Sequence, residues 1–216
     1  MSNVSFKAQS GEIFGLLGPN GAGKTTTMRI IVSLLKPDSG NVFFNDIDVI
    51  NHPDIVRSKI AFLTTDLKLD MRSDANTLFD FFADLYHLSS YDGRKRKDEL
   101  FETFGINSFA DTKISKLSQG MKQKVSIALS VIHNPPFVIF DEPTNGLDVV
   151  AARDVRSFIL NLKKEGKCVI VSTHIFDLVE KICDRVGMII DGQMIVDDKL
   201  ENLTVGKSLE DSFYDY

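Results

Sequence analysis

The feature that most constrains this chain is a run of eight residues, 18–25, with the sequence Gly-Pro-Asn-Gly-Ala-Gly-Lys-Thr. It fits the pattern G-x-x-x-x-G-K-[ST] of a phosphate-binding loop. Its glycines let the backbone turn tightly and point successive N–H groups at anionic oxygens. Lys24 can reach the terminal phosphates of a nucleotide, and the Thr25 hydroxyl suits a Mg²⁺ ligand. The predicted phosphate-binding residues are Gly18, Pro19, Asn20, Gly21, Ala22, Gly23, Lys24, Thr25 and Thr26.

The segments on either side of this loop favour a true phosphate site over a chance match to the pattern. Residues 12–17 are typical of a short buried strand, and residues 26–35 are typical of a helix. A helix that starts at the loop adds the positive end of its dipole to the backbone donors. We therefore expect a strand, a phosphate-binding loop and a helix in direct succession.

The composition is that of one soluble globular domain, with 43% hydrophobic and 25% charged residues in a chain of 216. The net charge of −5 gives no reason to expect binding to nucleic acid. The basic run at residues 94–97 is followed by two acidic residues, so we interpret it as a solvated helix face. Cys168 and Cys183 lie in apolar surroundings, which indicates two buried thiols in a reducing cytosol.

Nothing in the sequence predicts a membrane-spanning segment. No charged stretch followed by an apolar one occurs at Met1, so we expect no signal peptide. The longest uncharged run, residues 125–140, is interrupted by Asn-Pro-Pro and is too short to span a bilayer. The chain is not expected to cross a membrane by itself.

Strands and helices alternate along the chain, which predicts an α/β fold with a mostly parallel sheet. One domain is expected over residues 1–216, with a helical subdomain at about 70–133 because three helices follow one another there. Strands are predicted at residues 4–8, 41–44, 60–64, 137–141, 168–173, 186–190 and 194–196, and the three helices at 75–88, 92–104 and 119–133.

Two carboxylates end the apolar strand at residues 137–141, and they are candidates for chemistry on a phosphate. Adjacent strand residues face opposite ways, but where the chain bends at the end of a strand both side chains can reach one cleft. Asp141 is placed to hold Mg²⁺ through water, and Glu142 to polarise the attacking water. The alternative, that the pair simply caps the next segment, is less attractive beside a phosphate-binding loop.

Further motifs follow in an order that identifies a family. Leu117, Ser118, Gln119 and Gly120 open a helix, with Ser118 as a good N-cap. Residues 143–148, Pro-Thr-Asn-Gly-Leu-Asp, follow the acidic pair, and His174 follows the strand at 168–173. Together with the phosphate-binding loop, these motifs resemble the ABC ATPases over about residues 4–213. The branch they resemble most is the ATP-binding subunit of bacterial sodium and drug exporters.

The resemblance implies a P-loop NTPase core with a small antiparallel β part, and ATP and Mg²⁺ as cofactors. It also implies that Thr25 and Asp141 bind the metal, that Glu142 and His174 are catalytic, and that Asp148 lies in a loop at the dimer interface. ABC ATPases work as head-to-tail homodimers, or as heterodimers with a related ATPase, so Leu117, Ser118, Gln119 and Gly120 of one subunit would face the γ-phosphate held by the other. The implied partner is a separate transmembrane permease, which holds the ATPase at the cytoplasmic face of the membrane.

This chain departs from the family in two places. Members usually carry an aromatic residue upstream that stacks on adenine, but only three residues precede Val4, and Phe6 is expected to face the core. The chain is therefore expected to be short at its start, and the loss of stacking would weaken ATP binding by about 5- to 150-fold. Where the family has Pro-Gln, this chain has Thr65-Asp66; either residue could replace the glutamine through a water, or hydrolysis could be slow.

The leading hypothesis is an ATP-hydrolysing subunit that drives a membrane exporter. The alternatives are a soluble ABC ATPase outside transport, which would normally add coiled coils, zinc-binding cysteines or a second cassette, and a degenerate regulatory module. Docking to the permease is expected between residues 65 and 88. This segment contains an apolar cluster whose spacing is that of the buried face of a helix. The cluster is more aromatic than one buried face requires, so part of it is a candidate docking surface; its members are Leu78, Phe79, Phe81, Phe82 and Leu85.

Overall fold

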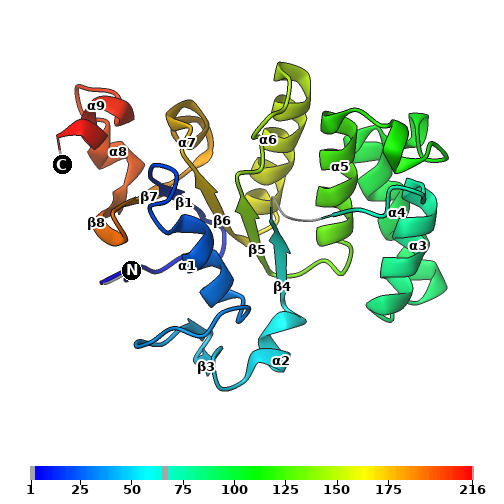
Figure 1. Cartoon of the computed structure of the whole chain (residues 1–216), viewed down its shortest axis with the longest axis horizontal. Helices are drawn as coiled ribbons and strands as arrows, with labels where there is room; N and C mark the ends of the chain where they lie inside the picture. Colours follow the sequence, from blue (N-terminus) through cyan, green and yellow to red (C-terminus); the bar gives the residue numbers. More distant parts are fainter. Residues whose placement is uncertain (1–2, 65–67, 216) are drawn as a thin grey trace. The chain divides into compact units, whose positions relative to one another are not determined.

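The computed structural model describes residues 3–64 and 68–215 and confirms an α/β fold (Figure 1). Its strands are β1 (Ile13–Leu17), β2 (Phe43–Phe44), β3 (Ile47–Asp48), β4 (Ile60–Leu63), β5 (Phe137–Asp141), β6 (Cys168–Thr173), β7 (Arg185–Ile190) and β8 (Gln193–Lys199). Its α-helices are α1 (Lys24–Ile31), α2 (Pro53–Arg57), α3 (Ala75–Leu85), α4 (Ser90–Phe104), α5 (Gln119–Ser130), α6 (Val149–Lys164), α7 (Phe176–Ile182), α8 (Leu200–Leu203) and α9 (Leu209–Tyr214). Short 3-10 helices occur at Ile106–Ser108 and Ile114–Lys116.

The main sheet has six strands in the order β4-β5-β6-β1-β7-β8. The pairs β5–β6, β6–β1 and β1–β7 are parallel, and β8 pairs antiparallel with β7. Strands β2 and β3 form a separate antiparallel pair. Every residue of β1 and β5 is buried, as expected where helices cover both faces of a parallel sheet. The predicted mostly parallel sheet with a small antiparallel part is therefore confirmed.

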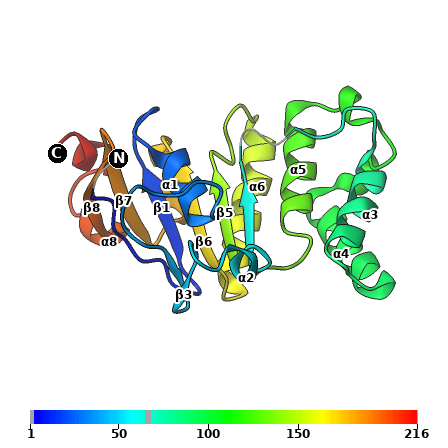
Figure 2. The same ribbon diagram turned by 60° about the horizontal axis from the view of Figure 1, so that its bottom comes forward.

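Contacts group the chain into two compact units. The first comprises Met1–Phe62, Pro135–Glu142 and Ile159–Tyr216, and the second comprises Leu63–Asn134 and Pro143–Phe158. In the first unit, α1 packs against β5 and β6 (Figure 2). Helix α7 packs against β1. In the second unit, α3, α4 and α5 pack on one another, with the rings of Phe79 and Phe101 edge to face at 5.4 Å.

The predicted strand at residues 4–8 is wrong, because the structure shows no strand in that segment. The alternation that suggested it is nevertheless present: Val4, Phe6 and Ala8 pack against the core, and the ring of Phe6 stacks on that of Phe14 at 4.6 Å. Alternation requires only one packed face, whereas a strand also needs a hydrogen-bonded neighbour, which the described residues do not supply.

Helix α1 differs from its predicted range at both ends. It begins at Lys24 rather than at residue 26, and it ends at Ile31 rather than at residue 35. The backbone of Ser33 is left-handed, with φ +58, and the N–H groups of Leu34 and Leu35 both turn back to the carbonyl of Arg29. Helices α6 and α7 were not predicted as such from the sequence. Among the residues that the structure describes, no helix is both long and apolar enough to span a bilayer.

Both cysteines are free thiols in the first unit, Cys183 buried just after α7 and Cys168 half-buried on β6. Burial raises the pKa of the Cys168 thiol to about 12, with the nearby Glu12 carboxylate adding to the effect. Burial also raises the pKa of Cys183. Because the thiolate is the reactive form, both side chains are packing groups rather than nucleophiles.

We therefore expect the folded protein to resist alkylation of its thiols. With a pKa of about 12, roughly one Cys168 side chain in ten thousand is ionised at pH 8. Iodoacetamide at pH 8 should label neither cysteine in native protein and both in 6–8 M urea (roughly the range that unfolds small domains), as counted by intact-protein mass spectrometry. Rapid labelling of the native protein at either position would contradict the burial described here.

Candidate phosphate-binding site

Three loops meet at the carboxyl-terminal edge of the main sheet because β1, β6 and β5 are neighbours and parallel. The register places Leu17 beside Thr173 and Asp141 beside Ser172, so the three strands end within one residue of one another. The segments that leave these ends are the glycine-rich loop after β1, the acidic pair at the end of β5 and the histidine after β6. This edge is where open α/β sheets bind ligands.

The loop after β1 depends on glycine for two different reasons. Gly21 and Gly23 have φ values of +84 and +104, which L side chains rarely adopt, and Gly23 is the N-cap of α1. Gly18 is restricted by space instead, because a Cβ there would lie 2.2 Å from the carbonyl oxygen of Ile189 on β7. The loop thus leads directly into the N-terminus of α1, and the N-terminus of a helix favours an anion.

Lys24 is buried, with its side chain only 6% exposed. Its Nζ donates to the carbonyl oxygens of Gly18 at 2.8 Å and Pro19 at 3.1 Å. The same ammonium lies 3.6 Å from Oε1 of Glu142. A positive charge is therefore held inside the loop, beside a carboxylate from β5.

Thr25 and Asp141 lie together, as the donor set of a magnesium site requires. The Thr25 hydroxyl donates to Oδ2 of Asp141 at 2.7 Å, and the Ser172 hydroxyl donates to Oδ1 of the same carboxylate. Asp141 is 2% exposed. Mg²⁺ binds hard oxygen ligands and uses one or two carboxylates together with substrate phosphates, so this hydroxyl and carboxylate beside a phosphate-binding loop fit that ion.

Glu142 is turned into the site by an unusual backbone conformation. Its φ is +50, and its N–H donates to the carbonyl of Ser172 at 2.9 Å. The side chain is mostly buried: Oε2 accepts from the Thr173 hydroxyl at 3.1 Å, and Oε1 lies 2.9 Å from Nδ1 of His174. The structure thus brings Lys24, Asp141, Glu142 and His174 together within one unit of the chain.

Sequence reasoning missed the two hydroxyls that hold these carboxylates, Ser172 and Thr173. Both are fully buried at the end of β6. The available signal was two consecutive hydroxyl residues at the carboxyl end of an otherwise apolar strand, directly before His174. Polar side chains at that position of a buried strand need partners, and the acidic pair supplies them.

The other predicted residues belong to the second unit. Ser118 is the N-cap of α5, and its side chain accepts the N–H of Met121 at 3.2 Å. A Cβ at Gly120 would lie 3.0 Å from that of Ala151, so glycine lets the two segments approach closely. Asp148 accepts the N–H groups of Val150 and Ala151, each at 2.9 Å, at the start of α6. Leu117 is buried and Gln119 is exposed.

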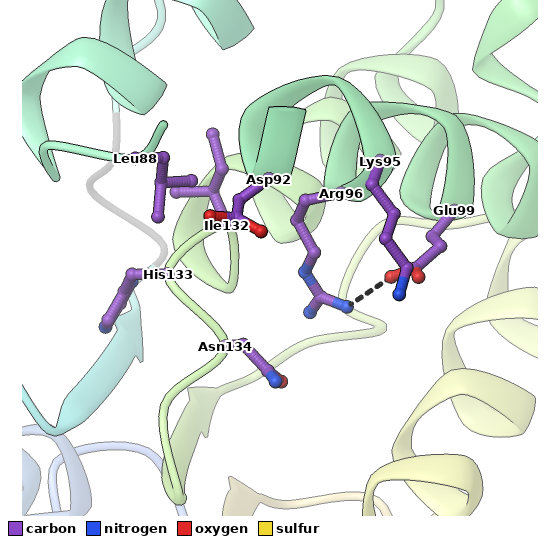
Figure 3. Close-up of a pocket in the computed structure, with 8 residues that line it drawn as sticks. All are labelled: Leu88, Asp92, Lys95, Arg96, Glu99, Ile132, His133 and Asn134. Atoms are coloured by element: carbon purple, nitrogen blue, oxygen red, sulfur yellow. Dashed lines mark hydrogen bonds and ion pairs between the residues drawn. The ribbon is translucent and has the colours of Figure 1, made fainter. Parts of the chain in front are cut away.

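The candidates for the missing family glutamine, Thr65 and Asp66, lie outside the described residues. A separate cavity of about 220 Å³ occurs in the second unit (Figure 3). Both basic and acidic side chains line it, and two of them, Arg96 and Glu99, form an ion pair at 3.3 Å. It contains none of the predicted phosphate-site residues; its lining is Leu88, Asp92, Lys95, Arg96, Glu99, Ile132, His133 and Asn134.

Comparison with known proteins decides the family. The family model described as "ABC transporter" matches residues 1–145. This chain belongs to the ABC transporter family. The family predicted from the motifs is therefore confirmed.

Relatives and solved structures agree with this assignment. The ABC transporter ATP-binding protein NatA of Bacillus subtilis (strain 168) is 38% identical, over 98% of this chain and 87% of that protein. Nod factor export ATP-binding protein I of Neorhizobium galegae is 32% identical, over 91% of this chain and 57% of that protein.

A solved ATP-binding subunit of an ABC transporter matches with a TM-score of 0.89 and 28% identity, over 98% of this chain and 90% of that chain. The dimeric post-hydrolysis structure of the ATP-binding cassette MJ0796, bound to ADP and Pi, matches with a TM-score of 0.81 and 28% identity, over 92% of this chain and 89% of that chain. The chain is thus an ABC-type ATPase, homologous to exporter-type ATP-binding proteins.

The close approach of Gly18 to the backbone of Ile189 predicts that any side chain at position 18 destabilises this ABC ATPase. In Gly18→Ala the new methyl must displace the backbone of Ile189, and we expect the free energy of unfolding to fall by about 1–3 kcal/mol. Gly11→Ala is the matched control, because that glycine has φ +74 but open space around it, so only a conformational cost of about 1 kcal/mol applies. Urea unfolding measures both. A Gly18→Ala protein as stable as the parent would contradict the described fit.

Proposed function

We propose that this ABC ATPase hydrolyses ATP on the loop Gly18–Thr26 and that Glu142 polarises the attacking water. The observation that supports this most strongly is the chain of contacts at one sheet edge, in which Glu142 contacts both Lys24 and His174. Hydrolysis of a phosphoanhydride needs mainly positioning and neutralisation of charge. This edge offers both, with a buried ammonium, a helix N-terminus and two carboxylates.

The residues divide into those that hold the phosphates and those that act on water. Lys24 now donates to two carbonyls of its own loop, and phosphate oxygens would compete for the same ammonium. Thr25 and Asp141 would hold Mg²⁺, which supplies further positive charge to the phosphates when it is bound. Glu142, which accepts from neighbouring side chains, can equally accept a hydrogen bond from water, and His174 beside it can contact the γ-phosphate.

A second copy of the chain would complete the site, in a head-to-tail arrangement. Ser118 presents its hydroxyl at the N-terminus of α5, where backbone N–H groups and the helix dipole attract an anion. The side chain of Ser118 is exposed. The dimeric relative bound to ADP and Pi supports the general case of a paired cassette.

If Glu142 polarises the water, Glu142→Gln should lower kcat by about 10²- to 10⁴-fold while MgATP still binds, because the amide keeps the size but loses the charge. ATP should then hold the variant as a dimer, measured by light scattering alongside turnover. Lys24→Ala is the control for the phosphate site and should bind no MgATP by calorimetry.

Two results would count against this assignment. Turnover of Glu142→Gln at the parent rate would remove Glu142 as the carboxylate that acts on water. Unchanged MgATP affinity in Lys24→Ala would remove the loop as the phosphate site.

We also propose that a transmembrane permease is the partner and that the pair exports its substrate, with the ATPase on the cytoplasmic face. The family description and the name of the Nod factor export relative support this. Helix α3 offers a surface for such a partner: Phe79 is buried, whereas Phe81 and Leu85, one turn apart, are 60% and 58% exposed. The ring of Phe82 lies edge to face against that of Phe81 at 5.5 Å.

The docking hypothesis predicts that Phe81→Ser weakens association with the permease by about tenfold or more, because an exposed aromatic anchor is lost. MgATP affinity should stay within about twofold, since the phosphate-site residues belong to the other unit. Co-purification with the native membrane protein and calorimetry provide the two measurements. Tyr91→Ser on α4, where the ring is 77% exposed, is the matched control. If association survives in both Phe81→Ser and Phe81→Ser/Leu85→Ser, the docking surface lies elsewhere.

A further inference from the structure

We propose that Thr173 is a positioning residue for ATP hydrolysis, because its hydroxyl fixes one oxygen of Glu142 and leaves the other to act on water. This inference rests on the proposed role of Glu142. The hydroxyl of Thr173 lies 3.1 Å from Oε2 of Glu142 and 3.1 Å from the backbone N–H of Ile175. The side chain is completely buried.

The direction of these two hydrogen bonds follows from the chemistry of the groups. A backbone N–H can only donate, so the Thr173 oxygen accepts from Ile175. An ionised carboxylate can only accept, so the Thr173 hydroxyl hydrogen points at Glu142. The hydroxyl cannot rotate away without losing a bond in a buried place, and this makes it an oriented donor rather than a freely turning one.

Thr173 is also held firmly itself. It is the last residue of β6, which lies between β5 and β1, and it sits beside Leu17 in the register with β1. Glu142, by contrast, lies just past the end of β5, with a left-handed backbone. The contact therefore ties a residue outside the sheet to one of its central strands.

The two oxygens of Glu142 have different surroundings. Oε2 faces Thr173, whereas Oε1 lies 2.9 Å from Nδ1 of His174 and 3.6 Å from Nζ of Lys24. Lys24 is the group that a nucleotide's terminal phosphates would engage. Oε1 is thus the oxygen on the phosphate side, and the bond from Thr173 to Oε2 holds the plane of the carboxylate so that one oxygen stays directed to that side.

The test compares Thr173→Val, which keeps the shape and removes the hydroxyl, with Thr173→Ser, which keeps the hydroxyl. We expect kcat of the Val variant to fall by about 10- to 100-fold, less than for Glu142→Gln, because the carboxylate remains but is poorly aimed. KM for ATP and the dissociation constant of MgADP by calorimetry should stay within about twofold. The Ser variant should retain kcat within about threefold.

A matched control is Thr204→Val, which removes a threonine hydroxyl that bonds to the carbonyl of Leu200, away from the phosphate site. Thermal unfolding of all variants separates loss of activity from loss of fold, and Thr173→Ala provides a second variant without the hydroxyl if Thr173→Val does not fold. A parent-like kcat in Thr173→Val or Thr173→Ala would overturn the proposal. So would a fall in kcat that is matched by an equal loss of MgADP affinity, because that would be a structural role.

The same data set distinguishes failure of this inference from failure of the proposed function. If Glu142→Gln turns over ATP at the parent rate, the role of Glu142 is wrong and the role of Thr173 falls with it. If Glu142→Gln is inactive while Thr173→Val hydrolyses ATP normally, Glu142 keeps its role and only the positioning role of Thr173 is overturned.

Discussion

The arrangement of the candidate phosphate site depends on one buried acidic group, the carboxylate of Asp141. At 2% exposure it would be costly to bury without partners, and within the described part of the chain the hydroxyls of Thr25, at the start of α1, and Ser172, on β6, donate to it. These bonds connect the glycine-rich loop to two strands of the sheet. The ammonium of Lys24, next to Thr25 in the chain, brings a positive charge to the same edge. Removing either hydroxyl partner would therefore disturb the loop as well as the carboxylate.

The backbone of Glu142 adopts a strained, left-handed conformation that directs its side chain into the site. An L residue at φ +50 is disfavoured by about 1–3 kcal/mol, and such residues gather at functional sites. If the backbone continued as a strand, Glu142 would point to the opposite face from Asp141. The left-handed turn lets both carboxylates reach the same edge, and the bond from the Glu142 N–H to the carbonyl of Ser172 stabilises that turn. In this conformation the Glu142 side chain also contacts Thr173 and His174.

The central strands and the glycine-rich loop between β1 and α1 could be predicted from the sequence because their signals leave little choice. An apolar run such as residues 137–141 or 168–173, ended by polar residues, fits a strand buried on both faces, and both predicted ranges match the structure. In the segment at residues 4–8, apolar and polar residues alternate clearly, as in a strand. The segment nevertheless forms no strand, because no neighbouring strand among the described residues is hydrogen-bonded to it. Two consecutive hydroxyl residues at the end of β6 were a signal for Ser172 and Thr173, but their partners depend on the register between β5 and β6, whose paired residues are 31 positions apart.

The motif residues of the second unit show how a single group can serve the fold and still be available for a ligand. The oxygen of Ser118 accepts the N–H of Met121 and so stabilises the start of α5. A hydroxyl that accepts a hydrogen bond still has its own hydrogen to donate, and the N-terminus of a helix is a place where anions are favoured. In the first unit, the Thr173 hydroxyl also takes part in two hydrogen bonds at once: it accepts the N–H of Ile175 and donates to Glu142. In both places the hydroxyl oxygen accepts a backbone N–H and the hydroxyl hydrogen remains to be donated to another group; at Thr173 that group is Glu142.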